Sequence, residues 1–267
     1  MNRDDRPFLA VLATIGGAYV FLIVSMVLAN TFFVTQRGLV GFRTPEIQFA
    51  IWFSLLTSSI SALFSTFVAV PMGYVMSRTS FRGKRLLDAV LDIPIVLPPL
   101  VIGLSLLILY QTPPGRFFQK HFFEVTYQQV SVVIAQFAVA CAFAVRAMKI
   151  TFDQITPRSE QVAMTLGCTR QQAFFRVVVP EARRGILAAF SIAWARSFGE
   201  FGPVLVFSGA TRMKTEVLST TVFLELSVGR IEAAAAVSLF MVVIAMGVLL
   251  VLRFLGPAEA VGRTVRP

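Results

Sequence analysis

The chain has 267 residues, of which 56% are hydrophobic and only 14% are charged, and its formal net charge is +10. Soluble domains carry about 25% charged residues, whereas this chain contains recurrent runs of about 20 apolar residues, each long enough to cross a bilayer. The composition excludes a soluble enzyme. It indicates an all-α, multi-pass membrane protein in which residues 1–267 form a single transmembrane domain.

Six apolar segments are expected to be transmembrane helices, at about 8–30, 49–77, 88–110, 130–149, 186–208 and 232–254. The second to sixth of these, about 49–254, are expected to form the core of the transmembrane domain. Cytoplasmic loops carry an excess of Lys and Arg. With both termini in the cytoplasm, 16 of the 24 Lys and Arg residues lie on that side and 7 lie outside. The cytoplasmic set includes Arg3, Arg6, Arg253, Arg263 and Arg266, and the outer set includes Arg37 and Arg43. This asymmetry accounts for most of the positive charge without a nucleic-acid-binding patch.

The third predicted span is rich in proline and contains Pro94, Pro98, Pro99 and Gly103. Each proline removes a backbone donor, and inside a helix it causes a bend or a break. Irregular backbone at membrane depth is tolerated only where protein covers it or where it lines a water-filled cavity. The segment is therefore a candidate wall of a transport pathway. The alternative is a helix that begins after Pro99 and has a proline-rich entry.

The segment from Ile150 to Arg184 is too charged to span a membrane, yet it carries strong helix signals. Thr156 followed by Pro157 is typical of a helix start. Gly167 predicts a left-handed helix end, and Thr169 with Gln172 matches a capping box. The pattern predicts a helix, a glycine turn and a second helix. Such a unit can either dock on a soluble partner or pack beneath its own bundle.

Residues 159–180 of this segment resemble the coupling loop of ABC importer permeases, through which a membrane subunit binds its ATPase. The family pattern of Glu, Ala, Ala and a later Gly aligns with residues 161–163 and 167. Here Gln161 and Val162 stand in place of the first Glu and Ala, whereas Ala163 and Gly167 match the pattern. Glu160 lies one residue earlier. The resemblance places a coupling loop at about 150–185 and assigns it these residues: Glu160, Gln161, Val162, Ala163, Gly167, Val177 and Pro180.

The resemblance implies a permease subunit that is not itself an enzyme. Its expected partners are two copies of a separate ATPase, which bind ATP and magnesium, an extracytoplasmic substrate-binding protein, and a second copy of the chain within the cytoplasmic membrane. The sequence contains no G-x-x-x-x-G-K-[ST] phosphate-binding loop, which agrees with a separate ATPase. No cofactor, metal or catalytic residue is expected in this chain.

The fifth predicted span contains R-x-x-G-E-F-G, formed by Arg196, Gly199, Glu200, Phe201 and Gly202. Together with VLPPLVIG at 96–103, it is similar to importers of molybdate, tungstate and sulfate, and it favours molybdate or tungstate. A charge at the bilayer centre is unfavourable by about 2.5–3.5 kcal/mol, so Arg196 and Glu200, four residues apart, are expected to pair. They either hold a gate or line the anion route, or they form a stabilising buried pair or a pair near the cytoplasmic interface.

Two other classes of function compete with the importer. An ion-coupled secondary transporter requires carboxylates deep in the membrane, and Glu200 is the only good candidate for this role. A membrane-embedded enzyme requires a cluster of His, Asp, Glu or Cys at one depth. His121 is the only histidine, and the two cysteines, Cys141 and Cys168, are expected on different sides of the membrane boundary.

Overall fold

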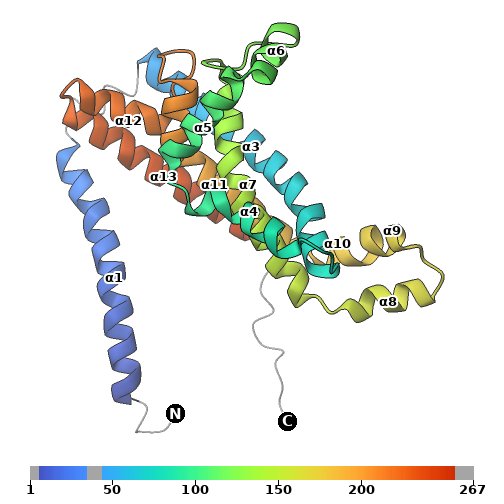
Figure 1. Cartoon of the computed structure of the whole chain (residues 1–267). Coiled ribbons are helices and arrows are strands. Elements are labelled where there is room, and N and C mark those ends of the chain that lie inside the picture. Colours follow the sequence, from blue (N-terminus) through green and yellow to red (C-terminus); the bar gives the residue numbers. More distant parts are fainter. Residues whose placement is uncertain (1–5, 35–43, 256–267) are drawn as a thin grey trace.

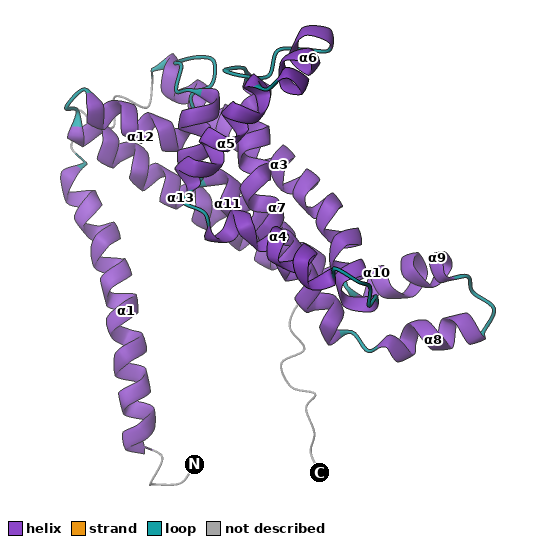
Figure 2. Ribbon diagram, viewed as in Figure 1, coloured by secondary structure: helices purple, strands orange, loops and turns teal. Residues whose placement is uncertain are grey.

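The computed structural model describes residues 6–34 and 44–255 (Figure 1). Within these ranges the chain forms helices, turns and loops, and no strand (Figure 2). The predicted all-α fold is confirmed. Both chain termini lie outside the described residues, as do several arginines on which the predicted orientation depends: Arg3, Arg37, Arg43, Arg263 and Arg266.

Among the described residues, four helices are long and apolar enough to cross a membrane. They are α1 (Arg6–Phe33), α3 (Pro45–Arg78), α7 (Gln129–Gln154) and α13 (Ile231–Leu255). These helices match the first, second, fourth and sixth predicted spans. The third predicted span is instead a bent pair, because α4 (Lys84–Val96) and α5 (Pro99–Gln111) meet at 111° across Leu97 and Pro98.

The fifth predicted span is interrupted, so the expectation of one continuous helix over 186–208 is wrong. Helix α11 (Arg183–Phe198) has 16 residues and is about 24 Å long. A non-helical break at Gly199–Phe201 follows it, and a π-helical turn, η4 (Val204–Ser208), comes after the break. Two glycines and Pro203 explain the break, because glycine weakens a helix and proline lacks the N–H that would continue it.

The shorter elements lie at the two ends of the bundle (Figure 1). One end carries the residue 155–182 segment, called the α8–α10 loop below. It comprises α8 (Pro157–Thr165), α9 (Arg170–Ala173), the π-helical turn η3 (Phe174–Val178) and α10 (Val179–Glu181). The opposite end carries α6 (Pro113–His121) and α12 (Leu218–Ser227).

Helices α3, α7 and α11 pack against one another and form the centre of the bundle. Small residues permit this close packing: a Cβ placed on Gly73 of α3 would lie 2.7 Å from the Cβ of Met148 on α7. Helix α1 behaves differently. None of its apolar window is buried, it contacts α13, and most of it stands apart from the bundle (Figure 1).

Candidate functional site

Local sequence signals shape the α8–α10 loop as predicted. Thr156 is the N-cap of α8 and Pro157 occupies its first turn, although the Thr156 side chain makes no capping hydrogen bond. Gly167 has φ +93°, a conformation that disfavours residues with a Cβ, and it ends the first helix. Thr169 and Gln172 form the predicted capping box, with hydrogen bonds of 2.9 and 3.2 Å.

One side of α8 is exposed and apolar. Val162 is 49% exposed and Leu166 is 79% exposed, and Gln161 and Gly167 are also exposed. Ala163 faces inward and is buried. In the second half of the loop, Val177 is half-buried in η3 and Pro180 is exposed in α10. The predicted coupling residues thus divide into an outward-facing set and an inward-facing set.

Glu160 belongs to the inward-facing set, although a loop carboxylate is ordinarily expected in solvent. Its side chain is 5% exposed. Its carboxylate accepts a hydrogen bond of 2.5 Å from the Tyr74 hydroxyl and lies 3.6 Å from the Nε atoms of both Arg78 and Arg170. Tyr74 and Arg78 were not predicted as partners of Glu160. They are one helical turn apart at the end of α3, but nothing in the sequence relates them to Glu160.

The pathway candidates from two predicted spans meet each other. Gly103 in α5 is buried, and a Cβ there would lie 2.7 Å from Pro203 Cα. A Cβ on Gly202 would lie 2.9 Å from the Cβ of Pro99 and 3.0 Å from the N of Leu100. The start of α5 therefore packs directly on the break that follows α11. Both glycines are required for this close approach of two backbones.

The other predicted pathway residues lie around this contact. Pro94 is half-buried within α4, whereas Pro98 is the exposed N-cap of α5. Gly199 is the exposed C-cap of α11, with an ordinary φ of −85°. The predicted break in the proline-rich segment is confirmed, and it falls between Val96 and Pro99.

Arg196 and Glu200 form the predicted pair, with 2.8 Å between Arg196 Nη1 and Glu200 Oε2. The Glu200 side chain is 1% exposed, whereas that of Arg196 is 31% exposed. The Arg196 guanidinium also lies over the ring of Phe143 on α7, 5.6 Å from its centroid. Ser219 on α12 donates to the Glu200 carbonyl at 2.8 Å. The pair thus links the break after α11 to two further helices.

A second charge cluster was not predicted as a site. Arg146 on α7 donates to Asp88 of α4 at 2.9 Å and to Asp92 through two nitrogens, Nε at 2.5 Å and Nη2. The two aspartates are four residues apart and therefore share one face of α4. That spacing was the signal that could have identified them. The cluster fixes the amphipathic helix α4 against α7.

The opposite end of the bundle holds a third group of charges around α12. Glu225 pairs with Arg212 at 2.7 Å and with Arg230 at 3.1 Å. Glu216 is completely buried, and burial raises the pKa of its carboxyl group, although it accepts a 3.0 Å hydrogen bond from Thr221. Within the described residues, no group of three or more His, Cys, Asp or Glu side chains could hold a metal ion.

Comparisons with known proteins agree with this architecture. Residues 69–260 match the family model described as binding-protein-dependent transport system inner membrane component. The sulfate transport system permease protein CysT of Salmonella typhimurium is 33% identical over 196 residues, which are 73% of this chain and 71% of that protein. The molybdate/tungstate transport system permease protein WtpB of Pyrococcus abyssi is 30% identical over 242 residues, or 88% and 91% of the two chains.

Among solved structures, a similar chain occurs in a bacterial alginate ABC transporter in complex with alginate pentasaccharide-bound periplasmic protein. The TM-score is 0.74, and the match covers 99% of this chain and 97% of that chain at 18% sequence identity. At this level of identity the likeness establishes a shared fold.

Proposed function

Because the chain belongs to the family of binding-protein-dependent transport system inner membrane components, we propose that it is the permease subunit of an ATP-driven importer of an oxyanion, molybdate or tungstate. A separate ATPase supplies the energy, and an extracytoplasmic binding protein delivers the anion. The chain itself transports and does not hydrolyse ATP, so ATP and magnesium are bound by the ATPase.

The observation that carries this proposal is the outward-facing side of the α8–α10 loop. Val162 and Leu166 are 49% and 79% exposed and lie four residues apart, on one side at the end of a short helix outside the spans. Exposed apolar residues on a rigid helix fit a groove in a soluble partner. The loop is therefore the proposed docking site of the ATPase, with one ATPase on each of two permease copies.

The proposed ATPase docking site sets the proposed orientation of the molecule in the membrane. The α8–α10 loop lies in the cytoplasm with the two termini, and the protein spans the cell's cytoplasmic membrane. The end that carries α6 and α12 faces outward and receives the binding protein. Two copies form a homodimer with the pathway on the two-fold axis. The contact between the start of α5 and the break after α11, together with Arg196 and Glu200, controls the passage of the anion.

The choice of anion rests on the relatives and on the sequence pattern. The relative named for molybdate and tungstate aligns with 88% of the chain, and a relative named for sulfate aligns with 73% at a similar identity. The wider coverage supports molybdate or tungstate. Sulfate is the second candidate, because the relative named for it is 33% identical to this chain.

Reconstitution with the candidate ATPase and binding protein tests the proposal. The ATPase should copurify with the chain, and its activity should rise when binding protein is added with molybdate or tungstate. Stimulation by sulfate instead would retain the mechanism and change the substrate. Phosphate serves as the control anion. Absence of any ATPase association would contradict the proposal and favour an ion-coupled transporter.

A further inference from the structure

The inward-facing side of α8 is held by very few residues. Of the nine residues in this helix, only Glu160 and Ala163 are buried. A small alanine contributes little contact area, so Glu160 provides the main polar attachment of α8 to the rest of the molecule. The local helix signals at Pro157 and Gly167 specify the shape of the loop, but they do not attach it to the bundle.

The attachment is made to α3, which is not a chain neighbour of the loop. The Tyr74 hydroxyl donates to Glu160 Oε1 at 2.5 Å, and Arg78 Nε lies 3.6 Å from Glu160 Oε2. Arg78 also donates through Nη2 to the carbonyl of Ile155 at 2.6 Å, where α7 leads into α8. The end of α3 therefore contacts both α8 and Ile155, the C-cap residue of α7.

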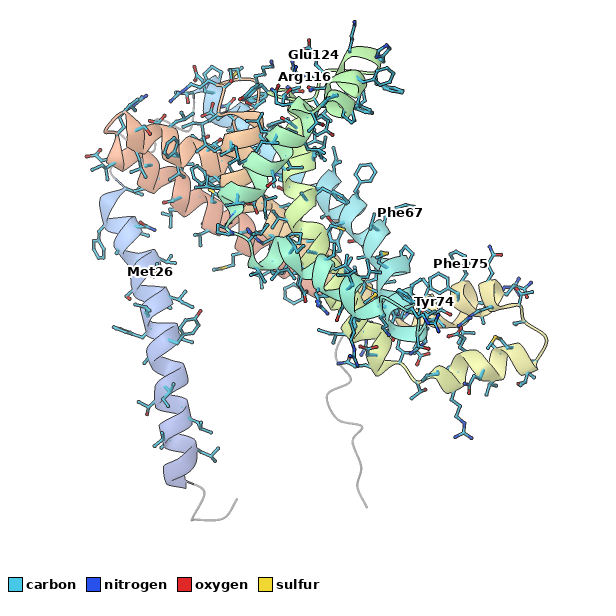
Figure 3. All side chains as sticks on the ribbon, viewed as in Figure 1. Met26, Phe67, Tyr74, Arg116, Glu124 and Phe175 are labelled. Carbon is cyan, nitrogen blue, oxygen red and sulfur yellow. The ribbon has the colours of Figure 1, made fainter. Side chains whose placement is uncertain are left out.

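Tyr74 is the centre of this junction, and Figure 3 shows it where α3 reaches the loop. Its ring packs edge-on against Phe152 of α7, with 5.7 Å between centroids, and against Phe174 of η3, at 4.7 Å. Arg170 of α9 completes the set, 3.6 Å from the same carboxylate. One buried carboxylate thus joins the first and second helices of the loop to α3.

A buried carboxylate is unfavourable unless hydrogen bonds and charges compensate it. An apolar residue at position 160 would pack against Tyr74 and hold the loop less specifically. The Tyr74 hydroxyl gives Glu160 a directional hydrogen bond, and the two arginines, each 3.6 Å away, compensate its charge. Together these contacts hold α8 in one orientation, so a rotation or a shift of α8 also acts on α3. The chain itself connects the loop only to α7 and α11, so the contact through Glu160 adds a third connection.

We infer that Glu160 is a positioning residue that fastens the α8–α10 loop to α3 through Tyr74 and Arg78, so that movement of α8 imposed by an ATPase is delivered to α3 as well as to α7 and α11. This inference rests on the proposed function. It differs from a role for Glu160 in contacting the ATPase, because the carboxylate faces the interior of this chain. The ATPase is instead contacted by the exposed residues of α8.

The test compares Glu160→Gln with the wild-type chain in proteoliposomes that contain the ATPase and the binding protein. Glutamine preserves the size of the side chain and an acceptor oxygen, but it removes the charge that attracts Arg78 and Arg170. The variant should copurify with the ATPase and hydrolyse ATP normally, while the amount of anion imported per ATP hydrolysed falls about tenfold, within the usual range of coupling between sites. Glu232→Gln, at an exposed position in the first turn of α13 and outside the loop, is the matched control and should leave this ratio unchanged.

A double-mutant comparison separates transmission from general stability. Tyr74→Phe removes the hydroxyl and keeps the ring, so Tyr74→Phe should also lower the import-to-ATP ratio. The double variant Tyr74→Phe with Glu160→Gln should lower the import-to-ATP ratio by less than the two single effects combined, because both substitutions disrupt the same contact. Glu160→Asp, which keeps the charge, should restore part of the ratio.

Two results would overturn the inference. One is a normal import-to-ATP ratio in Glu160→Gln, whether or not its unfolding temperature changes. The other is loss of ATPase copurification in this variant, which would place Glu160 at the ATPase interface. Failure of the wild-type chain to bind the ATPase would instead contradict the proposed function, so the two failures are distinguishable.

Discussion

Replacement of Gly103 by alanine tests whether α5 must lie directly on the break after α11. A Cβ at this position would lie 2.7 Å from Pro203 Cα, 3.0 Å from Pro203 O and 3.1 Å from Val206 Cβ, whereas ordinary contact begins at 3.4 Å. The backbone at Pro203 therefore has to move by about 0.7 Å, and closely packed interiors resist such movement. Overpacking of this kind lowers the free energy of unfolding by about 1–3 kcal/mol.

The same strain should also affect transport, because the contact joins two irregular segments at the proposed pathway. If the strain falls on one of two pathway conformations, about 1–3 kcal/mol displaces their equilibrium by about 5- to 150-fold. We expect Gly103→Ala to unfold at a lower temperature in detergent and to import anion more slowly in proteoliposomes. Both measurements start from the same purified protein, one before and one after reconstitution.

Gly247→Ala in α13 is the matched control. A Cβ there would meet nothing within 4 Å, and alanine stabilises a helix interior by about 0.5–1 kcal/mol relative to glycine. This variant should unfold at an equal or higher temperature and transport normally. If Gly103→Ala matches it in both unfolding and import, the contact with Pro203 is not required and the reasoning is refuted.

Three further predictions concern the loop, the buried pair and the outer end. Leu166→Asp places a charge on the exposed tip of α8 and should weaken ATPase copurification about tenfold without lowering the yield of folded chain; unchanged binding would exclude this surface. Arg196→Met leaves Glu200 buried without its cation, so it should lower the unfolding temperature more than the double variant with Glu200→Gln; equal losses would argue against the pair. Burial raises the pKa of Glu216, so its contribution to stability is present below the ordinary glutamate pKa and is lost as pH rises through the raised pKa. Glu216→Gln should remove that decline in thermal unfolding experiments between about pH 4 and about pH 8, and an unchanged slope would show that other groups cause it.

Features set by neighbouring residues could be predicted from the sequence. The capping box at Thr169 and Gln172 and the left-handed turn at Gly167 are confirmed, because each depends on contacts within a few residues. The break in the proline-rich span is confirmed for the same reason: Pro98 and Pro99 cannot donate backbone hydrogen bonds within a helix. Its angle of 111° is set by packing against other helices and has no local signal.

Contacts between distant segments could not be predicted. Tyr74 and Glu160 are 86 residues apart, and the sequence gives no reason to pair a span residue with that loop carboxylate. Arg146 binds Asp88 and Asp92 of α4, more than 50 residues earlier, and no local signal relates the three residues. The apolar run over 186–208 concealed the break at Gly199, because hydrophobicity measures burial and not backbone continuity.

In the proposed mechanism, ATP hydrolysed by a partner drives an anion through this chain. The most direct measurement is uptake of labelled molybdate or tungstate into proteoliposomes that carry the chain and its ATPase, with binding protein outside and ATP inside. We expect uptake that requires ATP and binding protein and continues when ion gradients are collapsed. Uptake that proceeds without the ATPase and stops when a proton or sodium gradient is removed would contradict it.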